Sequence, residues 1–237
     1  MSRAGIPCTI AAGAKSSVRQ VMVGLRLLAL IREVRTMGRT KLLLVAVCSV
    51  AAAIGCAGAA ALEIGQKGPD FTLAGTDGKV YSLATLKDAQ AVVLVFTCNH
   101  CPVAQAYEDR VIELAKSYKE KGVSVVAISP NDPEIVPQDS FENMLKRAEA
   151  KEYPHPYLYD ADQSVAKAYG ATCTPHVFVL DQERKLAYTG AIDDSDNARR
   201  VREHWLKEAL DALLAGKTPD RAVTKQRGCS IKWTRKR

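Results

Sequence analysis

The sequence predicts an α/β fold with a central mixed β-sheet flanked by helices. Residues 91–96 are six consecutive apolar residues rich in Val, which is typical of a central parallel strand. An amphipathic pattern follows Cys101, with apolar residues three or four positions apart, and ends at Gly122. A second apolar run occupies residues 123–128. This order indicates a β-α-β unit with two parallel strands in one sheet.

The remaining elements follow in chain order. Residues 70–73 and 79–83, joined through Asp77-Gly78, predict an N-terminal β-hairpin. Further expected elements are a helix from Asp139 or Ser140 to about Lys151, an extended piece at 157–159, a helix at 160–169, strands at 176–180 and 186–189, and a helix at 199–215. Strands and helices in this order require a mixed sheet with helices on both faces.

We predict that residues 1–62 are a leader and that residues 63–237 form one domain with a C-terminal tail. From Met37 the chain has a basic stretch, an apolar run at residues 42–50 and small residues to Ala61, the pattern of a secretory signal peptide. The preceding 36 residues fit an over-extended start, with Met37 as the initiator. An Arg-rich organelle transit peptide is the alternative.

Two other interpretations of the leader concern the membrane. A transmembrane anchor needs roughly 20 apolar residues, and this Ala/Gly-rich stretch is shorter. Residues 53–56 resemble a weak lipoprotein box, which would leave Cys56 acylated and the domain tethered. We therefore expect an exported protein, in the bacterial periplasm or secreted, whose membrane contact would be limited to a lipid at Cys56.

The net charge of +7 arises from the leader. Residues 1–62 hold eight Lys or Arg and one Glu, whereas the rest of the chain holds 25 basic and 25 acidic residues. A neutral domain gives no indication of nucleic-acid binding. The charge balance therefore gives no reason to expect a nucleic-acid partner.

Cys98 and Cys101 flank a dipeptide directly after the predicted central strand. Two thiols at this spacing can close a disulfide, and a helix that begins there favours a thiolate at the first sulfur. A thiolate is the nucleophile that opens another disulfide. The alternatives are a permanent disulfide and half of a zinc site, although a four-ligand zinc site usually has a second close cysteine pair. We predict a redox-active pair and no metal.

His100 lies between the two sulfurs in the sequence. If it is protonated, it stabilises a Cys98 thiolate and hence the reduced form, which makes the pair a stronger oxidant. The alternative is a histidine that only faces solvent. His176 is expected to begin a strand.

Several motifs together carry a resemblance that runs from about Ile64 to Trp233. They are residues 68–73 (GPDFTL), 99–102 (NHCP), 169–175 (YGATCTP), 177–181 (VFVLD) and 228–233 (GCSIKW). In this order the chain resembles the thioredoxin superfamily, and more closely the peroxiredoxin-like branch of the alkyl hydroperoxide reductase/thiol-specific antioxidant (redoxin) group. The resemblance implies a thioredoxin-like fold, Cys98 as the attacking thiol, Cys101 as the resolving thiol and Pro175 as a cis-proline facing them. It implies no organic cofactor.

Four of the seven cysteines lie outside the leader. The last two of them, Cys173 and Cys229, have two possible roles. Cys173, two residues before Pro175, is expected near the active pair, and Cys229 is in the tail. They form either a second disulfide that holds the tail on the domain, or a relay that exchanges with Cys98 and Cys101.

The sequence thus predicts an exported thiol–disulfide oxidoreductase that acts on protein or small-molecule disulfides and thiols with a redox partner. A thiol peroxidase is one alternative, although position 93 is Val and Thr97 is one residue out of place for a Pro-x-x-x-Thr-x-x-Cys motif ending at Cys101. A copper metallochaperone of the same fold is another, with His155 or His176 as a further ligand to the cysteines.

Overall fold

The computed structural model describes residues 61–235, and within them a five-stranded mixed sheet forms the centre. The strand order is β5 (Tyr157–Tyr159), β4 (Val123–Ser129), β3 (Ala91–Phe96), β7 (His176–Leu180) and β8 (Leu186–Gly190). β3, β4 and β5 run parallel, whereas β7 and β8 pair antiparallel to their neighbours. The predicted α/β class and mixed sheet are confirmed.

Strand β3 lies in the middle of the sheet because every one of its side chains is apolar and both of its faces are covered. All six of its residues are buried. Alternate residues enter different cores, Val92, Leu94 and Phe96 on one face and Ala91, Val93 and Val95 on the other. This period of two is what a strand between two layers requires.

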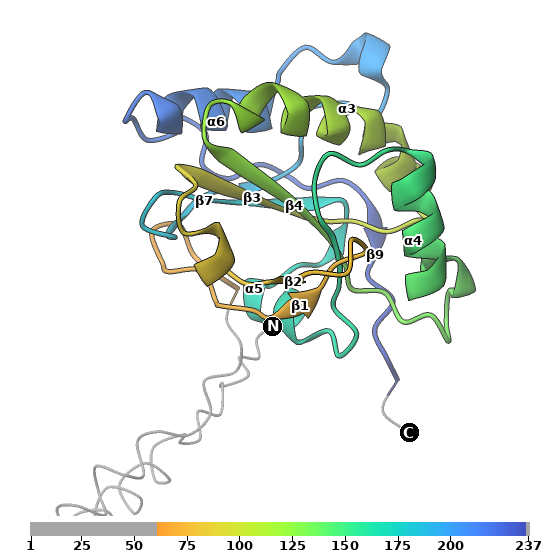
Figure 1. Cartoon of the computed structure of the whole chain (residues 1–237). Coiled ribbons are helices and arrows are strands. Elements are labelled where there is room, and N and C mark those ends of the chain that lie inside the picture. The colour runs from red at the N-terminus through yellow and green to blue at the C-terminus, as the bar shows by residue number, and fades with distance from the viewer. Residues whose placement is uncertain (1–60, 236–237) are drawn as a thin grey trace, which may run out of the picture. The chain divides into compact units, whose positions relative to one another are not determined.

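Helices cover the two faces of the sheet (Figure 1). On one face α3 (Pro102–Lys119) and α6 (Trp205–Leu214) lie together over the core that contains Val93. On the other face α5 (Ser164–Tyr169) packs on the core that contains Phe96. Helix α4 (Phe141–Ala150) packs beside β5, with Met144 against Ala127 and Tyr157. Short 3-10 turns complete the helices at η1 (Ala84–Leu86), η2 (Pro137–Asp139) and η3 (Ala198–Arg200).

The N-terminal hairpin forms as predicted, with short strands β1 (Leu73–Ala74) and β2 (Val80–Tyr81). Gly78 adopts a positive φ of 76°, a conformation that glycine reaches without steric cost. Asp77 accepts a hydrogen bond from the Lys79 N–H and completes the turn.

The last helix begins at Trp205, six residues later than the predicted start at Arg199. Two upstream side chains explain the difference, because they bond the backbone N–H groups that a helix would need. Asn197 accepts from the Arg199 N–H, and Asp194 accepts from the N–H groups of Arg202 and Glu203. The spacing of apolar residues does not reveal that side chains compete with the helix for these backbone N–H groups.

A second small sheet has no counterpart in the prediction. It pairs β6 (Cys173–Thr174) with β9 (Cys229–Ser230), so the C-terminal segment, residues 228–235, returns to the domain. A two-residue strand is too short to show alternating apolar and polar residues, so the sequence pattern could not predict this sheet.

The predicted leader, its signal peptide and Cys56 lie outside the described residues, except that Leu62 packs against the core containing Phe96. Within residues 61–235 no helix is both long and apolar enough to cross a bilayer. The division at residue 62 and the cleavage of a signal peptide stay predictions.

Candidate active site

Cys98 and Cys101 lie at the carboxyl end of the central strand, as the sequence predicts. Strand β3 ends at Phe96, and Cys101 is the N-cap of α3, with Pro102 in the first turn. Proline suits this position because the first N–H groups of a helix have no partner within it. Cys98 is 4% exposed, Cys101 is fully buried, and their side chains hydrogen-bond to each other.

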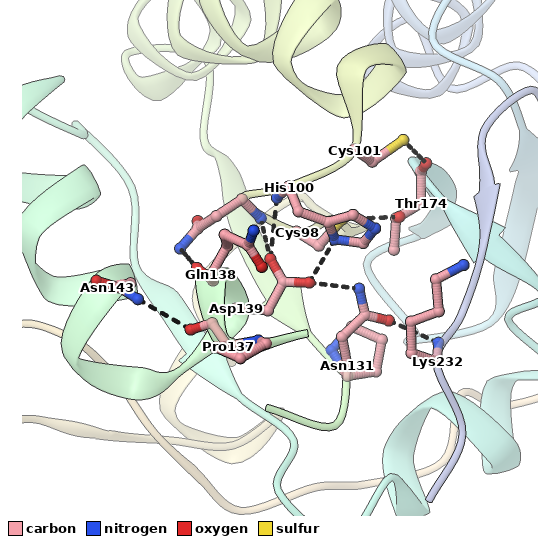
Figure 2. Close-up of polar contacts among 12 residues, drawn as sticks. Cys98, His100, Cys101, Asn131, Pro137, Gln138, Asp139, Asn143, Thr174 and Lys232 are labelled. Carbon is pink, nitrogen blue, oxygen red and sulfur yellow. Dashed lines mark hydrogen bonds and ion pairs between the residues drawn. The ribbon is translucent and has the colours of Figure 1, made fainter. Parts of the chain in front are cut away.

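The Thr174–Pro175 segment faces the two sulfurs. The bond between Thr174 and Pro175 is cis, which confirms the conformation that the resemblance implied. Cys98 Sγ lies 3.0 Å from Thr174 Oγ1, and Cys101 Sγ lies 3.3 Å from the Thr174 carbonyl oxygen. Figure 2 shows both contacts. Pro175 and Cys98 also line one small cavity, so the pair and the cis-proline form one site.

The two thiols act on each other's acidity because their side chains are in contact. Their shared hydrogen bond raises the pKa of Cys98, and burial and the nearby Asp139 carboxylate raise it further. The same hydrogen bond lowers the pKa of Cys101 against the effect of burial, with help from Cys229 and from the Ala104 N–H. Ala104 is in the first turn of α3, so the helix N-terminus acts on Cys101.

Asp139 is the site residue that sequence reasoning missed. Its fully buried carboxylate accepts four hydrogen bonds: from the Asn99 N–H at 2.7 Å, the His100 N–H at 3.0 Å, His100 Nδ1 at 2.6 Å and Asn131 Nδ2 at 2.8 Å. Figure 2 shows it between the Cys98–Cys101 loop and Asn131. The sequence offered Asp139 only as a possible helix cap, a role that Ser140 fills by accepting from the Asn143 N–H.

His100 is held by Asp139 and is only partly exposed, with 20% of its side-chain surface accessible. The predicted effect of a protonated His100 on Cys98 is opposed by this carboxylate, because an imidazolium–carboxylate pair has no net charge. The residue is therefore neither a free cation nor a histidine that only faces solvent. Its tuning role stays a prediction.

Asn99, between the cysteines, is fixed by three contacts. Its side chain donates to the Gln138 carbonyl and accepts from the Tyr157 hydroxyl, and its carbonyl accepts from Gln105 Nε2 at 2.7 Å. The loop that carries the thiols is therefore tied to β5, to η2 and to the first turn of α3. Such ties hold reactive groups in one geometry.

Cys173 and Cys229 are both brought to the site, but they are not bonded to each other. In the β6–β9 pair Cys173 is opposite Ser230, and Thr174 is opposite Cys229. Successive residues of a strand point to opposite faces, so the two cysteine side chains project from opposite sides of the ribbon. Cys173 Sγ contacts the Pro175 carbonyl, whereas Cys229 contacts Cys101. The structure therefore does not form the predicted Cys173–Cys229 disulfide.

The histidines suggested for a copper site do not join the cysteines among the residues from 61 to 235. The group that comes together there is Cys98, His100 and Asp139, whose candidate ligand atoms lie within 4.8 Å of one another. His155 lines the cavity next to Cys98, but its Nδ1 is near the Pro156 carbonyl. His176 begins β7, as predicted, and contacts Thr189. A thiolate, imidazole and carboxylate set suits zinc better than Cu(I).

His176 predicts a pH dependence of stability. It is 6% exposed, and burial lowers its pKa to about 4 from an ordinary value of about 6.5. Between these values the unfolded chain binds a proton that the folded protein excludes, so stability falls as the pH falls from about 6.5 to about 4. The expected loss is on the order of 2–3 kcal/mol, measured by urea unfolding across this range.

The matched variants are His176→Gln and His204→Gln, the second at an exposed position. His176→Gln should flatten the slope of unfolding free energy against pH between about 4 and 6.5, and His204→Gln should leave it unchanged. Equal slopes in the wild type and His176→Gln would contradict the assignment.

Residues 64–189 match the AhpC/TSA family, a span of more than half of the chain. The chain belongs to the AhpC/TSA family. The predicted thioredoxin-like fold is therefore confirmed for this chain, with its five-stranded mixed sheet flanked by helices.

Two solved structures are similar to this AhpC/TSA chain over most of its described part. An uncharacterized conserved protein from Geobacillus kaustophilus is 42% identical with a TM-score of 0.69, over 74% of this chain and 95% of that one. A hypothetical protein from Sinorhizobium meliloti 1021 is 38% identical with a TM-score of 0.70, over 74% of this chain and 97% of that one.

A relative with a named activity is "Thiol-disulfide oxidoreductase ResA" of Bacillus thuringiensis subsp. konkukian (strain 97-27). It is 26% identical over 158 residues, which are 67% of this chain and 80% of the relative. Its name and the family support a redox enzyme.

Proposed function

We propose that this AhpC/TSA protein is a thiol–disulfide oxidoreductase that uses Cys98 and Cys101 as its redox pair. The observation that carries the proposal is the contact between the two thiols at the end of β3, directly against Thr174 and Pro175. The named relative supports the same activity. Neither step of the reaction needs an organic cofactor, because the electrons are exchanged between sulfur atoms.

The difference in exposure supports different roles for the two sulfurs. Cys98 lines the small cavity with Pro175, whereas Cys101 is fully buried. Cys98 is therefore the sulfur that forms the mixed disulfide, and Cys101 is the sulfur that resolves it. The lowered pKa of Cys101 favours this sulfur as the group that accepts the proton of Cys98 when Cys98 attacks.

The reaction consists of two successive thiol–disulfide exchanges. Cys98 attacks a substrate disulfide as its proton passes to Cys101, and a mixed disulfide forms while one substrate thiolate leaves. That thiolate takes the proton from Cys101, whose sulfur attacks Cys98 and releases the second substrate thiolate. The enzyme ends with a Cys98–Cys101 disulfide, and the substrate gains two electrons. The opposite direction oxidises a dithiol substrate by the same steps.

The setting of this reaction is also part of the proposal. The signal-peptide pattern from Met37 to Ala61 supports export to the periplasm or outside the cell, and a lipid at Cys56 would tether the domain. The proposed partners are protein or small-molecule disulfides and thiols together with a redox partner. Mass spectrometry of the mature N-terminus from the native host tests this point, and a chain that retains residues 1–36 would contradict it.

The reduction potential of the Cys98–Cys101 pair tests the activity. The purified protein is equilibrated in glutathione buffers, its thiols are trapped, and the two redox forms are counted by mass spectrometry. A value near about −270 mV would make the protein a reductant of the thioredoxin kind, and one near about −120 mV an oxidant. A pair that stays entirely reduced or entirely oxidised across this range would overturn the proposal.

Peroxide reduction at Cys101 is the second candidate, and the lowered pKa of that thiol favours it. The full burial of Cys101 opposes it, because a peroxide must reach the sulfur. Stopped-flow measurement of peroxide consumption separates the candidates. Peroxide turnover that survives Cys98→Ser but is lost in Cys101→Ser would favour the peroxidase.

A further inference from the structure

The C-terminal segment crosses the active site and is held on both sides of Cys229. Gly228 lies against Thr174, where an added Cβ would come within 2.2 Å of the Thr174 carbonyl oxygen. Beyond Cys229, Ile231 enters the core with 3% exposure, and Lys232 bonds through its backbone to Asn131 and Asp132. The position of Cys229 is therefore fixed by packing and by backbone pairing.

Strand β9 lies where an extended peptide would pair with the site. It hydrogen-bonds to β6, the two residues that immediately precede Pro175. An exposed backbone edge beside reactive thiols is a natural place for a disulfide substrate to add a strand. Here the protein's own segment occupies that edge, and it carries a cysteine opposite Thr174.

The side chain of Cys229 reaches the redox pair. It packs on the cluster formed by Cys98, Cys101 and Ala104, and it hydrogen-bonds to Cys101. Cys98 and Cys101 are buried, whereas Cys229 is partly exposed. Among the described cysteines, Cys229 is therefore the one that contacts the pair and also meets solvent.

We propose that Cys229 is a third redox cysteine, whose thiol attacks Cys101 in the Cys98–Cys101 disulfide to form a Cys101–Cys229 disulfide and release Cys98. The proposal rests on the oxidoreductase function proposed above. One S–S bond breaks and one forms, the proton of Cys229 passes to Cys98, and no external oxidant or reductant is consumed.

This exchange moves the disulfide from a buried place to the surface. An external thiol, from a dithiol protein or a small thiol, can then attack Cys229, form a mixed disulfide there and release Cys101 as a thiol. A second thiol of the reductant resolves that mixed disulfide and returns the enzyme reduced. The C-terminal segment thus receives electrons for the pair beneath it.

The acidity of Cys229 agrees with an exchange that occurs in the oxidised protein. Burial and its contact with Cys101 raise the pKa of Cys229 to about 11 in the dithiol form. Once Cys101 is in a disulfide it carries no charge and no longer raises the pKa of Cys229. The pKa of Cys229 then falls, and its thiolate forms more readily. Cys229 therefore becomes reactive once Cys98 and Cys101 have formed their disulfide.

Full-length Cys98→Ser protein tests the proposal because it leaves Cys101 without its first partner. The protein is oxidised with diamide, acid-quenched, alkylated and digested with trypsin. The three remaining cysteines beyond residue 62, Cys101, Cys173 and Cys229, then lie in separate peptides, residues 88–110, 168–184 and 228–232. We expect the first and third to be linked in Cys98→Ser and in the matched Cys98→Ser/Cys173→Ser control, and the link to be lost in Cys98→Ser/Cys229→Ser.

Two further samples make the outcome decisive. In oxidised wild type the 88–110 and 228–232 peptides should be linked in part of the protein, beside the Cys98–Cys101 loop. In Cys98→Ser/Gly228→Ala the new Cβ displaces the segment, and the link should be strongly reduced while the far-ultraviolet circular dichroism is retained.

Failure of this inference differs from failure of the proposed function. A wild type that forms only the Cys98–Cys101 loop, or a Cys98→Ser protein in which Cys229 pairs with Cys173 or stays reduced, overturns the relay and leaves the oxidoreductase intact. A wild type that never forms the Cys98–Cys101 disulfide overturns both.

Discussion

Replacement of either Cys98 or Cys101 by Ser is expected to lower the rate of disulfide reduction by at least about a thousandfold, because the hydroxyl cannot act as a thiolate nucleophile. The two variants should differ in what they accumulate. Cys101→Ser keeps the cavity-lining Cys98 and should trap a mixed disulfide with the substrate. Cys98→Ser removes the sulfur that meets the substrate and should trap far less. Turnover of insulin disulfides and mass spectrometry of the quenched protein measure both effects.

Cys173→Ser is the matched control for these variants. Cys173 is buried, as Cys98 is, but its Sγ contacts the Pro175 carbonyl and not the pair. Its rate should stay within about threefold of the wild type, a change of under 1 kcal/mol. Equal trapping at Cys101 in Cys98→Ser would reverse the roles assigned to the two sulfurs.

Removal of the Asp139 carboxylate is expected to have the second largest effect, on stability and on thiol acidity together. Asp139→Ala leaves three buried donors without their acceptor, the N–H groups of Asn99 and His100 and the amide of Asn131. The expected cost is about 3–5 kcal/mol of unfolding free energy, because each buried donor left without an acceptor costs about 1–3 kcal/mol. Urea unfolding of the reduced protein measures it.

Asp139→Asn separates the charge from the packing. Asp139 adds to the effects of the Cys101 hydrogen bond and of burial in raising the pKa of Cys98. Without this negative charge the pKa of Cys98 should fall, and an anion on the contacting thiol pair, which exists only in the reduced form, should be stabilised. The pair should therefore become a stronger oxidant, with a less negative reduction potential. Thiolate absorbance against pH and glutathione equilibration measure the two quantities.

Asp132→Asn is the control for this charge. Asp132 lies in the same loop and accepts from the Glu134 N–H, but it is not among the groups that act on either thiol of the pair. It should leave the Cys98 pKa and the potential unchanged. If Asp139→Asn also left them unchanged, the carboxylate would have only a structural role.

Sequence patterns were sufficient to predict the central strands, the helix after Cys101 and the position of the two thiols. The Val-rich run at residues 91–96 is of strand length and predicts a strand buried on both faces, and the pattern after Cys101 is that of an amphipathic helix. Because Cys98 and Cys101 lie between these two segments in the sequence, they must lie where the strand leads into the helix. Likewise, turn chemistry at Asp77-Gly78 was sufficient to predict the hairpin.

The groups that act on those thiols could not be predicted, because they are brought together by long-range packing. Asp139 lies 38 positions beyond Cys101, and Cys229 lies 128 positions beyond it, so neither contact has a local signal in the sequence. The acidity of the pair also depends on burial and on nearby charges, which exist only after the chain has folded. Segments distant in sequence meet at this edge of the sheet because β3 and β7 pair there and because the C-terminal segment returns to β6. Periodicity specifies the elements, whereas long-range packing specifies the chemistry of the site.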